Sequence, residues 1–431
     1  MTQSVDASRA EIRSWLEENF SPHLTVSTWL ELLFEGCWAV PGWPAPWGGR
    51  GLTPAESVAV FEELRAAGVP GPPAGMGRAL AGPTLIAFGT EEQKARYLRP
   101  ILTGEEAWCQ LFSEPGAGSD LAGLRTRAEL RGDHYVLNGQ KLWTSNATTA
   151  DLGMLLARTD FEAPKHRGLT YFVIEMKQPG IEIRPLRKMS GDSTFSEVFL
   201  TDAVVPVENV VGGLNDGWRT ALGTLMNERV AISGGVPLEY TLTAPAGASG
   251  REIRALTLRE FTAAGVSYLP PTTGDSAMLG KGMDMLVRLA IDRRRADDPL
   301  VRQALATLHT AIAVSEWTAF RVSAHLEAGR PPGPEGSLGK MMASNVARLW
   351  RDTADLICGP DAVLSGVDGP LEGLVAEQFF NAPGPAIYGG SDQIQRNIVG
   401  ERVLGLPRDP GIDSSVPFRE LRTDATPRRV R

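Results

Sequence analysis

The sequence of 431 residues contains only three cysteines, Cys37, Cys109 and Cys358, and no two of them have the short spacing of a metal or redox motif. A disulfide framework is therefore excluded, and a reducing compartment is expected. The chain also lacks an apolar run near the length of about 20 residues that a bilayer span needs. Its N-terminus carries Asp6 and Glu11 where a signal peptide would have an apolar stretch. These features predict a cytoplasmic protein without a membrane segment.

An excess of positive charge is absent as well. The 43 Lys and Arg residues against 51 Asp and Glu leave a formal net charge of −8, opposite to the charge that a phosphate backbone or an anionic membrane attracts. The five histidines are isolated, and no His-Glu-x-x-His pattern occurs. The sequence therefore predicts no nucleic-acid partner and no catalytic metal. Its hydrophobic content of 42% is that of a folded globular chain.

Local patterns divide the chain into three stretches. Residues 1–107 have apolar side chains at steps of three and four, which is typical of helices. Within them, Thr53 is expected to cap one helix, and Thr90 with Gln93 forms a capping box at the start of another. This stretch is predicted to be an N-terminal helical domain.

Residues 108–212 show period-two strand patterns instead. The runs 134–137 and 140–144 flank Asn138-Gly139, the strongest short signal for a β-hairpin. Further strands are predicted at 152–157, 169–175, 181–185 and 197–200. This stretch is predicted to be a β-barrel or sandwich domain.

Residues 213–410 return to helical patterns and are predicted to form a helical bundle. The expected helices start near Asn215 and Asp216 and then cover 283–292, 299–326, 337–356 and 392–404. An irregular insertion at about 234–282 interrupts them, with one helix expected at 251–264. Residues 411–431, rich in Arg and Asp, are predicted to be a loosely held tail.

Several motifs occur together in a fixed order. The glycine-rich segment 114–120 lacks the Gly-Lys-Ser/Thr ending of a phosphate-binding loop, and by itself it would be read as a turn. It is flanked, however, by further motifs: WPAPWGGRG (43–51), GTEEQK (89–94), CQLFS (109–113), GDHYVLNGQK (132–141) and WTSN (143–146). In this order and spacing they resemble the acyl-CoA dehydrogenase family. The resemblance covers most of residues 40–234 and resumes at 337–405.

The resemblance implies an α+β fold with an N-terminal helical domain, a middle β-barrel domain and a C-terminal four-helix bundle. It implies FAD held between the subunits of a homo- or hetero-oligomer, a dimer or tetramer. The implied reaction is α,β-dehydrogenation of an acyl-CoA thioester to the trans-2-enoyl-CoA, and the implied electron acceptor is an electron-transfer flavoprotein.

The resemblance also assigns roles to individual residues. Those expected to bind FAD are Gln110, Phe112, Ser113, Ser119, Trp143, Thr144, Ser145, Ser391 and Gln393. Ser119 also matches a position that meets the thioester arm of the substrate, and Arg229 matches one that meets the CoA. Two simpler interpretations stay open: Trp143 could fill the core of the β-domain, and Ser391 could cap the helix that begins at Asp392.

The reaction requires a carboxylate that takes the α-proton while a hydride leaves the β-carbon for the flavin. Many family members carry this Glu in the C-terminal turn, where this chain has Gly389. Another branch carries it on the first helix of the C-terminal domain, directly before an arginine, and there the chain has Glu228-Arg229. Since Glu228 follows Leu225 by three residues and precedes Ile232 by four, apolar neighbours should raise its pKa. Gly389 is expected to offer its backbone N–H to the thioester carbonyl.

Besides Gly389, the chain departs from the family pattern at a second place. Most members have an Arg-rich stretch ending in Phe-Gly that contacts the FAD pyrophosphate, and residues 234–282 stand there instead. A bacterial branch that oxidises bulky acyl groups, including sterol side chains, matches better at 112–122, 195–198 and 333–337, and some of its members are heterotetramers. The first hypothesis is a dehydrogenase that uses Glu228. The alternatives are a non-catalytic or partner-dependent subunit and, less favoured, an acyl-CoA oxidase.

Overall fold

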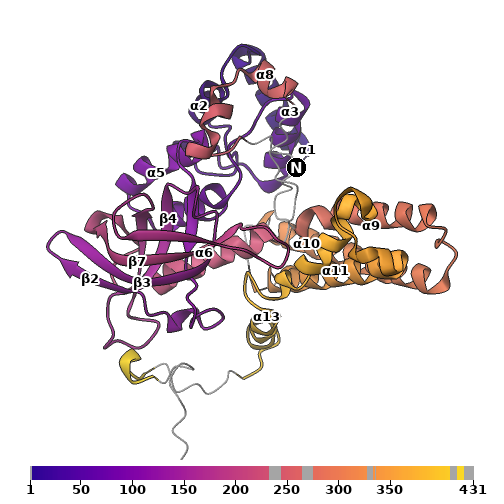
Figure 1. The fold of residues 1–431 in the computed structure, drawn as a ribbon. Coiled ribbons are helices and arrows are strands. Elements are labelled where there is room, and N and C mark those ends of the chain that lie inside the picture. Colours follow the sequence, from indigo (N-terminus) through magenta and orange to yellow (C-terminus); the bar gives the residue numbers. More distant parts are fainter. Residues whose placement is uncertain are drawn as a thin grey trace, which may run out of the picture.

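The computed structural model describes residues 2–232, 244–264, 275–327, 333–334, 336–407 and 415–421. The N-terminal part is helical and lies at the top of Figure 1. Its helices are α1 (Thr2–Asn19), α2 (Val26–Glu35), α3 (Pro54–Ala66), α4 (Gly82–Phe88) and α5 (Glu91–Thr103), and a π-helix, η2 (Gly77–Ala81), precedes α4. Both predicted caps are confirmed, since Thr53 accepts the Glu56 N–H and Thr90 accepts the Gln93 N–H.

The middle part is one eight-stranded sheet within residues 108–211, in the order β6-β7-β3-β2-β4-β5-β8, with β1 paired to β4. Its strands are β1 (Trp108–Leu111), β2 (Arg127–Arg131), β3 (His134–Ser145), β4 (Leu152–Arg158), β5 (Leu169–Glu175), β6 (Ile181–Leu186), β7 (Phe195–Pro206) and β8 (Val210–Val211). β4 and β5 are buried along nearly their whole length. The apolar strands predicted from the sequence therefore form the centre of this domain.

The predicted hairpin at Asn138-Gly139 is wrong, because β3 runs through both residues without a turn. The pairing of β3 with β7 shifts by a bulge at this point. There, the Asn138 side chain donates to the Asp202 carboxylate at 2.9 Å and accepts the Asp202 N–H at 3.0 Å. A Cβ on Gly139 would lie 2.4 Å from Thr126 Oγ1. Glycine is thus required here because the backbone at Thr126 comes so close to β3. The hairpin was predicted because Asn-Gly is more often found in a turn.

The C-terminal part contains α6 (Gly217–Ile232), α9 (Asp275–Asp292), α10 (Pro299–Glu327), α11 (Gly336–Cys358), α12 (Leu374–Asn381) and α13 (Asp392–Ile398). Figure 1 shows α9, α10 and α11 as a bundle that extends away from the sheet, with α6 between the bundle and the sheet. Trp350 of α11 is fully buried in this bundle, and its indole donates to the Gly282 carbonyl at 3.1 Å. Residues 275–282, expected to belong to the insertion, are therefore the first turns of α9.

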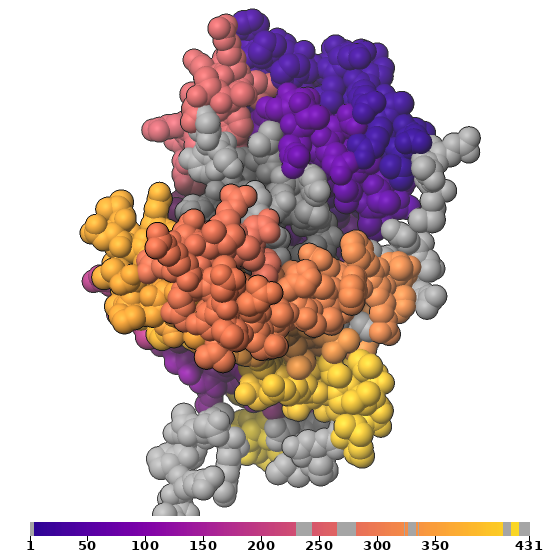
Figure 2. All heavy atoms as spheres, turned by 90° about the vertical axis from the view of Figure 1, so that its right-hand side faces the viewer, coloured from indigo at the N-terminus to yellow at the C-terminus, as the bar shows by residue number. Residues whose placement is uncertain are grey.

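The remainder of the insertion, as far as it is described, packs on the N-terminal helices (Figures 1 and 2). Val26 N–H donates to Leu256 at 2.9 Å, and Leu258 and Phe261 are buried in the N-terminal core. The single helix expected at 251–264 is two short ones, α7 (Arg251–Ala255) and α8 (Leu258–Ala263), because Thr257 caps a new start. Residues 233–243 and 265–274, also assigned to the insertion, lie outside the described residues.

Part of the predicted tail is docked on the β-domain. Phe418 is buried, its N–H donates to the Ala163 carbonyl at 3.0 Å, and the Arg158 guanidinium lies 3.4 Å from the centre of its ring. The expectation of a loosely held tail is wrong for residues 415–421, and the rest of 411–431 lies outside the described residues. The domain boundaries at 107 and 212 stay predictions. The structure places the end of α5 at Thr103 and the start of β1 at Trp108.

Candidate functional site

Glu228 lies where α6 meets the first strand of the sheet. Its side chain is half-buried, and the Gln110 side-chain amide on β1 donates to Oε2 at 3.5 Å. Burial raises the pKa of Glu228. The Gln110 hydrogen bond and the positive charges of Arg229 and Lys340 oppose that rise. A carboxylate whose pKa is raised in this way has an increased affinity for a proton.

Arg229 follows Glu228 on the helix but does not form an ion pair with it within 4 Å. Its side chain is half-buried, burial lowers its pKa, and the charge of Glu228 opposes that shift. The two charges therefore act on each other through space without direct contact. Successive residues of an α-helix point about 100° apart, because the helix has 3.6 residues per turn. The Arg229 guanidinium therefore points away from the Glu228 carboxylate.

Lys340 on α11 is a further charged residue near Glu228, and sequence reasoning missed it. It is fully buried, donates to the Pro385 carbonyl and lies 3.7 Å from the Asp392 carboxylate. Asp392 in turn accepts from Ser344 at 2.7 Å. Lys340 thus connects the surroundings of Glu228 to the segment that leads into α13. The sequence did contain a signal, because Lys340 is spaced three or four residues from other buried positions of α11.

The turn before α13 contains two glycines, Gly389 and Gly390. Gly389 and Gly390 have φ values of 63° and 85°, a region that favours glycine. The Gln395 side chain donates to both of their carbonyls, at 3.1 and 3.3 Å. The Gln395 side chain thus fixes the carbonyl groups of the turn. The expected role of the Gly389 N–H stays a prediction.

A buried ion pair holds the segment that follows β1. Lys141 of β3 is fully buried and donates to the Phe112 carbonyl at 3.0 Å, the Leu156 carbonyl at 2.8 Å and the Glu114 carboxylate at 2.9 Å. Glu114 also accepts the N–H groups of Arg125 and Thr126, at 2.6 and 2.9 Å. Burial by itself would raise the pKa of Glu114, but Lys141 and these donors hold it below its usual value.

The expected cofactor residues of this segment lie beside the ion pair. Phe112 is buried edge-to-face against Tyr171, with ring centres 5.8 Å apart. The Ser113 carbonyl accepts the Leu142 N–H at 2.9 Å, and the Ser113 side chain is half-buried. β1 and the end of β3 are therefore joined side by side. Sequence reasoning identified these segments but not the ion pair that joins them, because no local pattern marks a charge as buried.

The end of β3 presents an unusual pair of side chains. Trp143 is 57% exposed with φ 60°, edge-on to Phe195 at 5.8 Å, so the interpretation of Trp143 as core is wrong. Thr144 is fully buried, and among the described residues its hydroxyl has no hydrogen-bond partner. Ser145 is half-buried next to it. The exposed indole offers an aromatic surface to a ligand, and the Thr144 hydroxyl is a buried group that the described residues leave without a hydrogen bond.

Three expected site residues are not joined to Glu228. Ser119 and Gln393 are exposed, and Ser391 caps α13 by accepting the Ile394 N–H at 3.4 Å. Within the described part of the chain, none of the three shares a hydrogen bond with Glu228 or Gln110. The simpler interpretation of Ser391 as a helix cap is therefore confirmed, and the ligand roles of all three stay predictions.

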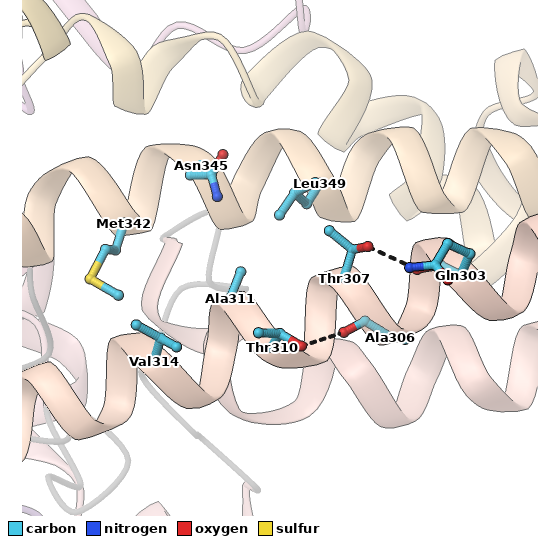
Figure 3. A pocket seen from close by; sticks show the side chains of 9 residues that line it. All are labelled: Gln303, Ala306, Thr307, Thr310, Ala311, Val314, Met342, Asn345 and Leu349. Carbon is cyan, nitrogen blue, oxygen red and sulfur yellow. Dashed lines mark hydrogen bonds between the residues drawn. The ribbon is translucent and has the colours of Figure 1, made fainter.

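A cleft elsewhere in the molecule does not belong to this site. It has a volume of about 460 Å³ and lies between α10 and α11, where Figure 3 shows side chains from both helices around it. Its lining residues are Gln303, Ala306, Thr307, Thr310, Ala311, Val314, Met342, Asn345 and Leu349. None of them is an acid or a base. The cleft therefore offers no group that could move a proton.

Comparisons with known proteins agree with this architecture. Models of the N-terminal, middle and C-terminal domains of acyl-CoA dehydrogenases match residues 2–105, 109–203 and 277–404. The acyl-CoA dehydrogenase IpdE1 of Mycobacterium tuberculosis is 35% identical over 431 aligned positions, which cover 94% of this chain and 99% of the relative. The chain therefore belongs to the acyl-CoA dehydrogenase family, and it is an oxidoreductase of that class with the α+β fold of the family.

Solved structures with similar folds include two-component assemblies. The Tcur3481-Tcur3483 steroid ACAD has a TM-score of 0.69 and 26% identity, over 94% of this chain and 98% of that chain. The ChsE4-ChsE5 complex from Mycobacterium tuberculosis has a TM-score of 0.68 and 27% identity, over the same shares of each chain. Proteins of this family typically bind FAD. No described helix is long and apolar enough to cross a membrane.

Proposed function

We propose that this chain catalyses the FAD-dependent α,β-dehydrogenation of an acyl-CoA thioester to the trans-2-enoyl-CoA, with Glu228 as the base. The single observation that carries the proposal is the position of Glu228: a half-buried carboxylate with a raised pKa, in contact with Gln110 on the strand expected to lie along the flavin. The loss of the usual Glu at position 389 leaves Glu228 as the candidate that matches a known branch of the family.

In this mechanism the Glu228 carboxylate takes the α-proton, and the electron pair left on the α-carbon forms the new double bond as a hydride leaves the β-carbon. Bound FAD supplies the acceptor for that hydride. The Gln110 amide donates a long hydrogen bond to Oε2, at 3.5 Å. The backbone N–H of Gly389 is proposed to donate to the thioester carbonyl, which makes the α-proton more acidic.

The residues at the end of β3 are proposed to hold the flavin ring. The exposed Trp143 indole offers a face or edge to a planar ring system, and the unpaired Thr144 hydroxyl offers a buried hydrogen-bonding group. Gln110, Phe112, Ser113 and Ser145 are proposed to hold the same ring, and Ser391 and Gln393 the adenosine half. Ser119 and Arg229 are proposed to meet the acyl-CoA.

The chain is proposed to act in an oligomer, homomeric or heteromeric, that passes electrons to an electron-transfer flavoprotein. Two structural neighbours are assemblies named for two proteins each, the ChsE4-ChsE5 complex and the Tcur3481-Tcur3483 steroid ACAD. Trp317 and Phe320 on α10 are 66% and 71% exposed, which suits a surface that another chain covers. A bulky acyl group is the favoured substrate, and a cytoplasmic location stays a prediction. A subunit that needs its partner for FAD is the second candidate, because no Arg-rich stretch ending in Phe-Gly is present.

An anaerobic titration of the FAD-loaded protein with a panel of acyl-CoAs tests the proposal. Flavin absorbance should bleach in the wild type with at least one acyl-CoA, while Glu228→Gln should bind the same ligand without bleaching. Glu252→Gln, which changes an exposed carboxylate on α7, serves as the matched control and should bleach like the wild type. Bleaching that survives in Glu228→Gln would refute the assignment of the base. Protein that holds FAD only with a second chain would favour the partner-dependent subunit.

A further inference from the structure

Arg78, in the π-helix η2, is a positively charged residue that the proposed mechanism does not use. Its side chain is half-buried, and its guanidinium makes one long hydrogen bond, from Nη1 to the Pro72 carbonyl at 3.4 Å. Within the residues that the structure describes, it has no carboxylate partner. Burial lowers the pKa of Arg78 to about 10, so the group is still charged at neutral pH.

Two other buried cations of the protein, Lys141 and Arg158, have full sets of partners. Lys141 has the Glu114 carboxylate and two carbonyls. Arg158 donates to the carbonyls of Ala122, Leu124 and Lys165 and packs on the Phe418 ring. Removing a charge from water is unfavourable unless other groups replace the water. Arg78 and Arg229 lack such a set among the described residues, and of the two only Arg78 has no role in the proposed mechanism.

The neighbours of η2 place this π-helix beside the helix that carries the proposed base. α4, which continues η2, packs on α6: the Thr84 and Thr224 hydroxyls are 2.8 Å apart, and Arg219 lies 5.3 Å from the Phe88 ring. Since residue numbers rise along α4 as they fall along α6, the two segments are antiparallel. Four residues before Thr84 is η2, and four residues after Thr224 is Glu228. The π-helix therefore packs beside the turn of α6 that carries the base.

The other side of η2 faces the strand that contacts the base. A Cβ on Gly77 would lie 3.1 Å from the Trp108 ring at the start of β1. Trp108 and Gln110 are on the same face of β1, because side chains alternate along a strand. Gln110 is the residue whose amide contacts Glu228. Arg78 thus belongs to a segment that contacts both α6, which carries Glu228, and β1, which carries Gln110.

Arg78 is not a partner of the base itself. The charges that act on the pKa of Glu228 are those of Arg229 and Lys340, and the shift of Arg78 comes from burial. A ligand bound by Arg78 would therefore leave the charge of Glu228 in place. π-Helices are found often at functional sites, where they redirect a side chain.

We propose that Arg78 binds an oxygen acceptor, a carboxylate or a carbonyl, on the part of the acyl group remote from the thioester. The inference rests on the proposed dehydrogenase function and narrows its substrate class to acyl-CoAs with an oxygen-bearing tail. A guanidinium binds a carboxylate with two parallel hydrogen bonds and a carbonyl with one or two. Either ligand would supply the acceptor that the described part of the chain does not.

Calorimetric binding to the FAD-loaded protein, with any chain that co-purifies, tests this inference. The probes are hexanoyl-CoA, adipoyl-CoA and 5-oxohexanoyl-CoA, and their ten-carbon counterparts. Arg78→Met should weaken binding of the oxygen-bearing probes by about 10- to 100-fold and leave the plain acyl-CoAs within about twofold. Arg78→Lys should recover part of the loss, whereas Arg302→Met, a change of an exposed arginine on α10, should behave like the wild type.

The outcomes separate this inference from the proposed function. Preference for adipoyl-CoA or for the oxo compound would identify the acceptor as carboxylate or carbonyl. Equal effects of Arg78→Met on all probes, no effect on any, or a wild type that binds no oxygen-bearing probe would overturn the inference. Because the affinities of the probes and the bleaching of flavin are separate measurements, selective binding without flavin bleaching would keep the Arg78 site and reject the dehydrogenase. Flavin bleaching without a preference for the oxygen-bearing probes would support the dehydrogenase and reject the Arg78 site.

Discussion

Replacing Lys141 with Met should destabilise the β-domain strongly, because the change leaves a buried carboxylate without its cation. Glu114 retains two backbone donors but loses the ammonium at 2.9 Å, and the Phe112 and Leu156 carbonyls lose their donor. Breaking one partner out of a buried ion pair costs about 3–5 kcal/mol. The expected loss of unfolding free energy for Lys141→Met therefore lies in that range.

Urea unfolding of the β-domain, followed by tryptophan fluorescence, would measure this loss, together with Glu114→Gln and the double variant. The double variant should be less damaged than the sum of the single changes by more than about 1 kcal/mol, because the second change removes the unpaired group. Arg131→Met is the matched control: Arg131 and Glu129 form an exposed pair at 3.6 Å on the same sheet, worth about 0–1 kcal/mol. A loss below about 1 kcal/mol for Lys141→Met, or additive effects, would refute the reasoning.

The pair also predicts a direction with pH. The pKa of Glu114 is lower in the folded protein than in the unfolded chain. The charged carboxylate therefore stabilises the fold at pH values above its pKa in the unfolded chain. This stabilisation is lost as the pH falls through the pKa of the folded protein. The difference in stability between wild type and Glu114→Gln should therefore shrink in acid. A difference that stays constant from neutral pH to strong acid would show that the carboxylate charge is not what stabilises the segment.

Two further predictions concern Lys340 and Gly139. Since the charge of Lys340 lowers the pKa of Glu228, Lys340→Met should move the rising limb of the pH profile for flavin reduction to higher pH. A profile that falls in amplitude but keeps its position would indicate a purely structural role. Gly139→Ala should cost about 1–3 kcal/mol, because its Cβ would lie 2.4 Å from Thr126 Oγ1. Urea unfolding checks this, and a loss within about 0.5 kcal/mol would contradict the account of the bulge.

The helix starts were predictable because their causes are local. Thr53 and Thr90 each bond a backbone N–H three residues ahead, so the signal and the structure lie in one short segment. The Asn138-Gly139 error has the opposite origin. The Asn138 side chain bonds Asp202 on another strand, and no local pattern reports which distant strand a residue will meet.

The candidate site was only partly predictable for the same reason. Glu228 and Gln110 are far apart in sequence, and they were placed in one site through the family resemblance and not through any spacing. Lys141, Lys340 and Arg78 were not identified, because a charged residue is expected at the surface unless its partner is known. Burial of these three groups follows from the packing of separate elements, and that packing becomes visible only in the structure.

The central claim is that Glu228 removes the α-proton. The most direct test is the rate at which deuterium from D₂O enters the α-carbon of a bound acyl-CoA, followed by mass spectrometry in wild type and Glu228→Gln. We expect wild type to catalyse the exchange and Glu228→Gln to slow it by about 10²- to 10⁴-fold, the usual contribution of a general base. An exchange rate that is unchanged in Glu228→Gln would contradict the account.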